Sequence, residues 1–164
     1  MQPATTLKEY RSATRAMFDL SSFNNPLAVT LTLKPFTYSQ QGINPLTPDL
    51  ASQNLRHFIN QLSRKILMRS QFRSGRRIPC YPAYESRDVT PHYHLALDRP
   101  DHISLEGFTG MVAVAWHKTQ FGNRQIDIRP CDKGWIRYIT KLRTKEDFID
   151  SIDWNNCHRP DSAV

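Results

Sequence analysis

The sequence predicts an α+β domain in which helices flank one central antiparallel β-sheet. Three observations lead to this fold class. The chain has 164 residues, which suits one hydrophobic core, and its apolar content of 39% is ordinary for a globular protein. Short β-branched runs also alternate along the chain with longer segments of helical periodicity, in the order strand, helix, strand, strand, helix, strand, helix.

The first part of the chain predicts a short helix followed by a strand. The helix should span Thr6–Leu20 and end at a polar segment. Leu27–Lys34 alternates Thr with Leu and lies between Pro26 and Pro35, a pattern that is typical of a β-strand. A loop rich in Gln, Gly, Asn and Pro is expected from there to Thr47.

A long amphipathic helix should follow this loop. Thr47 is suited to cap the helix, and Pro48 is suited to its first position. Apolar residues then recur at helical spacing through about Arg69. A dense basic cluster occupies the end of the helix and the segment after it, and its members are Arg64, Lys65, Arg69, Arg73, Arg76 and Arg77.

The second half of the chain supplies the remaining strands and helices. Two extended runs, Ile78–Glu85 and His92–Leu97, are separated by a polar turn and predict an antiparallel pair. Leu105–His117 predicts a helix, although its glycines lower the helix propensity. Gln125–Arg129 alternates like a strand, and Trp135–Lys145 predicts the last helix. This order matches a split β-α-β or RRM-like topology with one antiparallel sheet.

Residues 1–164 are expected to form a single domain, because no linker, repeat or low-complexity stretch divides them. The core should span about residues 27–145, and the polar tail 147–164 should wrap the surface or fray. Three cysteines without CxxC spacing argue against a disulfide framework or a zinc knuckle. No apolar run approaches the roughly 20 residues of a membrane span, and no apolar signal region opens the chain, so a cytoplasmic location is expected.

The net charge of +7 and the pI near 9.6 favour a polyanionic partner, because Lys and Arg contacts to phosphates release condensed counterions. We therefore expect a nucleic acid, with the basic cluster on its backbone phosphates. Tyr81, Tyr84 and Trp135 offer faces on which unpaired bases could stack. Trp116 lies inside an apolar helix and is expected in the core.

His92 and His94 lie two residues apart in a predicted strand, so their side chains should point to the same face. Two imidazoles on one face can share a divalent metal. Glu85, which ends the preceding strand, could add a carboxylate, and such a set suits Mg²⁺ or Mn²⁺ in phosphoryl transfer. Asp88 and Asp98 are weaker candidates for the third ligand. Surface histidines and a solvated strand-end acid are the alternative interpretation.

Tyr138 and Lys141 are three residues apart, so on the predicted helix they would share one face. A phenol has an ordinary pKa of about 10 and is a poor nucleophile at neutral pH. A neighbouring ammonium and a metal-polarised phosphate are what it needs to attack phosphorus. A half-buried tyrosine beside a lysine whose stem lies along the surface is the alternative interpretation.

In their order along the chain, these motifs resemble those of the HUH endonucleases, the nickases that start rolling-circle replication of plasmids, phages and small circular single-stranded DNA viruses. The family's first motif is a short strand, which Val29–Leu33 resembles. Its second is His-hydrophobic-His and its third is Tyr-x-x-Lys, matched by His92–His94 and by Tyr138–Lys141. The resemblance covers roughly residues 27–142. It departs from the pattern in the bulky Tyr93 between the histidines.

The resemblance implies a metal-dependent, site-specific endonuclease and strand transferase acting on single-stranded DNA. His92 and His94 would bind Mg²⁺ or Mn²⁺, with Glu85 as third ligand by its position. Tyr138 would attack the scissile phosphate, forming a 5′-phosphotyrosine and freeing a 3′-OH, and Lys141 would orient the site. The implied partners are single-stranded DNA at a replication origin, which a hairpin could present, and host replication proteins. A plasmid- or virus-encoded protein would act inside the host cell.

Two other functions stay open. A single-tyrosine transposase shares the same motifs and differs in its DNA partners. A non-catalytic RRM-like module for single-stranded nucleic acid explains the charge and topology, but the RRM aromatic signature is absent from the sequence. A two-histidine phosphoesterase is excluded because paired His-x-Thr/Ser motifs are missing, and the chain has no Walker A motif of an ATPase.

Overall fold

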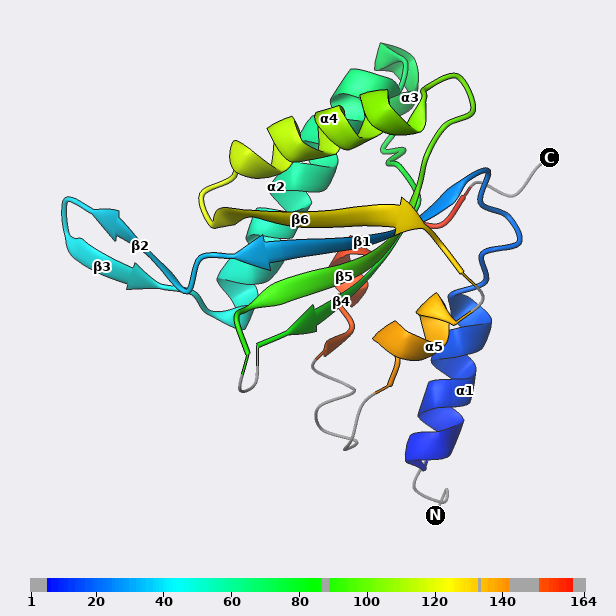
Figure 1. Ribbon diagram of the computed structural model, residues 1–164, viewed down its shortest axis with the longest axis horizontal. Coiled ribbons are helices and arrows are strands. Elements are labelled where there is room, and N and C mark those ends of the chain that lie inside the picture. The colour runs from blue at the N-terminus through cyan, green and yellow to red at the C-terminus, as the bar shows by residue number, and fades with distance from the viewer. Residues whose placement is uncertain (1–5, 87–88, 133, 142–150, 161–164) are drawn as a thin grey trace.

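The computed structural model describes residues 6–86, 89–132, 134–141 and 151–160. A four-stranded antiparallel sheet lies at the centre with helices on both faces, which confirms the α+β prediction (Figure 1). The strand order is β4-β5-β1-β6. The sheet is made of β1 (Pro26–Leu33), β4 (Cys80–Glu85), β5 (His92–Asp98) and β6 (Gly122–Pro130).

The connections between these strands form two split β-α-β units. The first runs from β1 through α2 (Pro48–Ile66) to β4, and the second runs from β5 through α4 (Leu105–His117) to β6. In each unit the two strands are separated by one strand of the other unit. This arrangement places β1 and β5, the two strands with the predicted motifs, side by side in the middle of the sheet.

Alternation along β1 and β5 divides their side chains between the two faces of the sheet. One face is apolar, and Leu31 and Leu95 on it are fully buried in the core that α2 and α4 cover. Burying a side chain of this size stabilises a fold by about 1.5–3 kcal/mol. Trp116 of α4 is also fully buried, as expected, and its Nε1 donates to the Thr32 carbonyl at 3.0 Å. This face therefore anchors the sheet.

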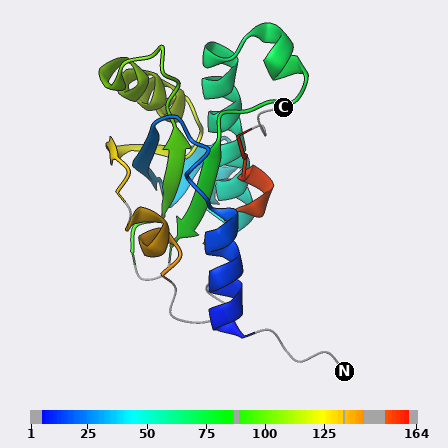
Figure 2. The same ribbon diagram turned by 90° about the vertical axis from the view of Figure 1, so that its right-hand side faces the viewer.

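The opposite face has small and polar residues and carries a second, smaller core. Ala28 and Ala96 leave room there for the buried aromatic rings of Phe18, Tyr81 and Trp135. Two helices contribute, α1 (Leu7–Met17) and α5 (Trp135–Ile139), which lie away from α2 and α4 (Figure 2). This face holds the candidate site.

Helix ends differ from the prediction at several places. The first helix was expected over Thr6–Leu20, but Thr6 caps α1, with its hydroxyl accepting from the Glu9 N–H, and α1 ends at Met17. α2 ends at Ile66, and a separate short helix, α3 (Arg69–Arg73), follows it. None of the helices in the described ranges has the length and apolar character that crossing a membrane requires.

A small hairpin replaces the loop that was expected before α2. It consists of β2 (Phe36–Ser39) and β3 (Gly42–Pro45), which pair only with each other. Its turn ends at Gly42, whose φ of 112° lies in the left-handed region that favours glycine. The loop prediction was wrong here because turn-forming residues flank and interrupt both strands, so neither run is long enough to show alternation.

The C-terminal residues 151–160 lie along the outer edge of β4. Isolated bridges join Cys80 to His158 and Ala83 to Ile152, and a short 3-10 helix, η1, spans Trp154–Asn156. Ile152 is buried in the second core. Part of the predicted tail is thus packed against the sheet. Burial of the apolar Ile152 side chain stabilises this position.

Candidate active site

The sheet register brings three predicted ligands together. Glu85 pairs with His92 across β4 and β5, and His94 lies two residues further along the same face. Glu85 Oε2 lies 3.4 Å from His92 Nε2 and 3.7 Å from His94 Nε2. The two Nε2 atoms are 3.0 Å apart. These three residues could hold a metal ion, since their ligand atoms all lie within 4.8 Å of one another.

The other ring nitrogen of each histidine has its own partner. His92 Nδ1 lies 2.7 Å from the Thr90 carbonyl oxygen, which can only accept, so Nδ1 carries the proton. His94 Nδ1 lies 3.0 Å from Thr30 Oγ1, a hydroxyl that can accept from it or donate to it. When the Thr30 hydroxyl accepts, the Nε2 lone pairs of both histidines are directed toward the space between them and Glu85. A hydrogen bond from the second nitrogen to a protein oxygen is the usual support of a metal-bound imidazole.

His94 is held in the neutral form that a metal ligand needs. Burial, and then the nearby His92, lower the pKa of His94 to about 4. The Nε2 atoms of His92 and His94 lie 3.0 Å apart, and Glu85 Oε2 lies within 3.7 Å of both. Two imidazoles and a carboxylate at this spacing form a donor set that fits a divalent ion.

Thr30→Val tests the hydrogen bond between the Thr30 hydroxyl and His94 Nδ1. The variant keeps the shape of the side chain but removes the hydroxyl next to Nδ1, so the imidazole loses the hydrogen bond that helps to orient its ring. We expect Mn²⁺ affinity, measured by isothermal titration calorimetry, to fall about 10–100-fold. Thr32→Val is the matched control, because the Thr32 hydroxyl donates to the Gln125 carbonyl and not to a histidine. Equal losses in both variants would contradict the assignment.

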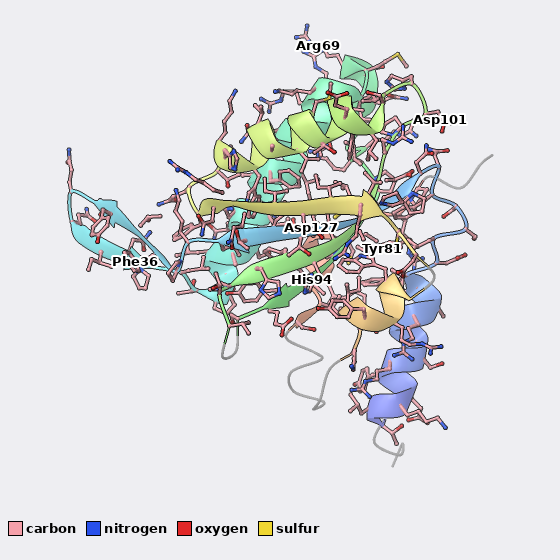
Figure 3. All side chains as sticks on the ribbon, viewed as in Figure 1. Phe36, Arg69, Tyr81, His94, Asp101 and Asp127 are labelled. Carbon is pink, nitrogen blue, oxygen red and sulfur yellow. The ribbon has the colours of Figure 1, made fainter. Side chains whose placement is uncertain are left out.

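Helix α5 places the predicted nucleophile beside the triad of Glu85, His92 and His94. The ring centroid of Tyr138 lies 5.2 Å from that of His94, at 73°, and 5.3 Å from that of Trp135, almost parallel. Trp135 is anchored to the sheet, since its Nε1 donates to the Leu95 carbonyl at 2.9 Å. Figure 3 shows His94 on the side of the sheet where α5 lies. Tyr138 is 54% exposed, so a substrate can reach it.

Lys141 does not lie on the helix that was predicted to reach Lys145, because α5 ends at Ile139. The Lys141 N–H donates to the Tyr138 carbonyl at 3.0 Å, so the two residues are joined by a turn. Thr140, the residue after α5, is fully buried, and its hydroxyl and its N–H both donate to the Ile136 carbonyl. The rest of the predicted helix lies outside the described residues.

The basic cluster does not converge on the triad. It lies at the end of α2, on α3 and just beyond, and Figure 3 shows Arg69 on the other side of the sheet from His94. Two of its members have structural contacts, because the guanidinium groups of Arg77 and Arg64 lie 4.2 and 5.2 Å from the centroid of the Phe72 ring. DNA contact by this cluster remains a prediction.

The predicted base-stacking aromatics are mostly internal. Tyr81 and Trp135 are buried, and Tyr81 stacks on Phe18 with ring centroids 4.6 Å apart. Tyr84 is half-buried beside Tyr93. The prediction that bases stack on Tyr81 or Trp135 is therefore wrong. Both rings are buried in the second core, where they pack over the small alanines of that face.

Sequence reasoning did not find Thr30 and Thr90, since a threonine in or beside a strand carries no signal of a histidine partner. The alternative ligand Asp98 lies at the far end of β5 and accepts from the Asn25 N–H at 2.8 Å, so it is not part of the triad. Asp88 lies outside the described residues. Asp127 of β6 pairs with Thr30 in register and lies on the same face.

No protein-family profile matches the chain, and neither a curated protein nor a solved structure shows significant similarity to it.

Proposed function

We propose that the protein cleaves single-stranded DNA with Tyr138 as the nucleophile, in the manner of the HUH endonucleases that its motifs resemble. The observation that carries the proposal is the contact between Tyr138 and His94. A partly exposed phenol from a separate helix lies against one ligand of a Glu-His-His triad. Each motif alone has an ordinary structural explanation, but their meeting at one site supports a chemical role.

Glu85, His92 and His94 are the proposed metal ligands. A divalent ion at this site would polarise a non-bridging phosphate oxygen and stabilise the charge that develops during phosphoryl transfer. Two nitrogen donors favour Mn²⁺ over Mg²⁺, which prefers oxygen ligands. Non-haem iron oxygenases use the same donor set, but a phenol beside it and the net charge of +7 favour a phosphodiester substrate.

Tyr138 supplies the group that forms the covalent bond. Its phenol loses a proton to solvent, and the oxygen then bonds to phosphorus while the bond from phosphorus to the 3′ oxygen breaks. The leaving oxygen takes up a proton and becomes a 3′-OH. Trp135 fixes the plane of the attacking ring by stacking on it, and Lys141 would stabilise the phenolate with its ammonium group.

The proposed role is the initiation of rolling-circle replication at an origin presented as single-stranded DNA. The 3′-OH would prime synthesis by host replication proteins, while the protein stays on the 5′ phosphate. A single-tyrosine transposase would use the same groups to join hairpin ends. Comparing the nicking of origin-like single strands with the joining of hairpin ends separates the two roles, because a replication initiator would favour the first substrate and a transposase the second.

The test is a search for a covalent adduct. The protein is incubated with a mixed pool of single-stranded oligonucleotides and Mn²⁺, and the products are separated on a denaturing gel. We expect a protein band of reduced mobility that carries DNA and disappears with EDTA. Cleavage without an adduct, or an adduct that forms equally in EDTA, would contradict the proposal.

A further inference from the structure

The β2–β3 hairpin exposes large apolar side chains. Tyr38 is 77%, Ile43 66% and Phe36 42% exposed, and the rings of Phe36 and Tyr38 meet edge to face with centroids 5.6 Å apart. Figure 1 shows the hairpin standing away from the rest of the molecule. A two-stranded hairpin is marginally stable alone, and exposed apolar side chains mark a contact surface.

The root of the hairpin is tied to the connection between α4 and β6. The Lys34 N–H donates to the Phe121 carbonyl at 2.8 Å, and Gln120 Nε2 donates to Thr37 Oγ1 at 3.4 Å. These bonds fix the direction in which the hairpin leaves the sheet, so its aromatic rings are presented by a supported arm.

The root is basic although the hairpin itself is uncharged. Lys34, Lys118 and Arg124 are exposed and come from the end of β1, the end of α4 and the start of β6. A hollow of about 450 Å³ opens beside Lys118, and Gln53 and His57 are among its other lining residues. Exposed cations of this kind suit the phosphates of a nucleic acid.

The hairpin leaves the same end of the sheet that holds the triad. Thr32, near the end of β1, pairs with His92, and β2 begins at Phe36 shortly after β1 ends. A nucleic-acid strand bound along the hairpin would therefore reach the end of the sheet where the triad lies. The basic cluster lies nearer the other end, because β4 begins just after it at Cys80, which pairs with Leu97.

We propose that the hairpin and its basic root bind the unpaired strand of single-stranded DNA, with Phe36 and Tyr38 stacking on bases and with Lys34, Lys118 and Arg124 on phosphates. This inference rests on the proposed function and names the surface that holds its substrate. A second copy of the chain is disfavoured as occupant, because a two-fold contact would bring these identical cations together.

The test measures binding without chemistry, by fluorescence anisotropy of a labelled single-stranded oligonucleotide of mixed sequence in EDTA. Tyr38→Ala should weaken binding about tenfold, because it removes a ring that stacks on a base. It should leave the salt dependence of binding unchanged, because no phosphate contact is removed. Tyr38→Phe, the matched control, keeps the ring and should bind like the wild type. Lys34→Gln should reduce the slope of log affinity against log salt by about 0.7.

Arg69→Gln provides the comparison between the two basic surfaces. We expect it to weaken binding less than Lys34→Gln, and circular dichroism should show that all variants are folded. Wild-type affinity in Tyr38→Ala would overturn the inference. So would light scattering that shows a dimer in the wild type and a monomer in Tyr38→Ala, because the hairpin would then bind a second copy.

The inference and the proposed function can fail separately. If binding depends on Tyr38 but no adduct forms with any DNA, the hairpin holds nucleic acid and the nickase proposal falls. If an adduct forms and Tyr38→Ala binds and cleaves like the wild type, the nickase proposal stands and the hairpin is not its DNA-binding surface.

Discussion

Tyr138→Phe is expected to abolish the covalent protein–DNA adduct and to lower cleavage by about 10³-fold or more, while binding of single-stranded DNA stays unchanged. The variant removes only the hydroxyl. The ring can still stack on Trp135 and contact His94, so the fold and the metal site are retained. Cleavage and adduct are read from a denaturing gel, and binding is read from anisotropy in EDTA.

The matched control for Tyr138→Phe is Tyr84→Phe. Tyr84 is half-buried, and its ring lies beside Tyr93 on the apolar face of the sheet, away from the triad. We expect this variant to cleave and to form the adduct like the wild type. An adduct that persists in Tyr138→Phe and disappears in Tyr84→Phe would show that the nucleophile has been misassigned.

His94→Ala is expected to remove metal binding and cleavage together. The variant deletes a buried ligand and with it one of the two facing Nε2 atoms. We expect Mn²⁺ affinity to fall by more than about 100-fold. Loss of a residue that only hydrogen-bonds to a metal ligand already lowers metal affinity by about 10–100-fold. Calorimetric titration of EDTA-stripped protein with Mn²⁺ measures the affinity, and the adduct gel measures the activity.

Two further variants make the His94 result interpretable. His94→Gln keeps more of the buried volume, so it separates loss of the ligand from a packing defect. His117→Ala changes an exposed histidine at the end of α4 and should leave metal binding intact. Wild-type Mn²⁺ affinity in both His94 variants would contradict the proposed metal site.

The two-residue repeat of a β-strand was sufficient to predict the strands of the site and the shared face of His92 and His94. The alternation in Leu27–Lys34 and the spacing of His92 and His94 depend only on the two-residue repeat of a strand, which a sheet cannot alter without exposing its apolar face. Glu85 was predicted from its place at the end of the preceding strand, and the register of β4 and β5 brings it opposite His92. The first two relations follow from local geometry, whereas the position of Glu85 also depends on how β4 and β5 pair.

Relations that depend on tertiary packing could not be read from the sequence. Clustering of arginines predicted contact with phosphates, but it does not reveal which face of the sheet their helix covers or how far the cluster lies from the histidines. The local pattern did not show that α5 ends at Ile139, and the position of residues 151–160 depends on pairing with the edge of β4. The support of His94 by Thr30 likewise exists only once β1 and β5 are paired.

The most direct test of the central claim is to locate the bond between protein and DNA. The adduct formed with Mn²⁺ is digested with a nuclease and a protease, and the peptides are analysed by tandem mass spectrometry. A nucleotide phosphate on Tyr138, with every other tyrosine unmodified, is the predicted result. A phosphate on another residue, or an adduct whose Tyr138 peptide is recovered wholly unmodified, would contradict the proposed function.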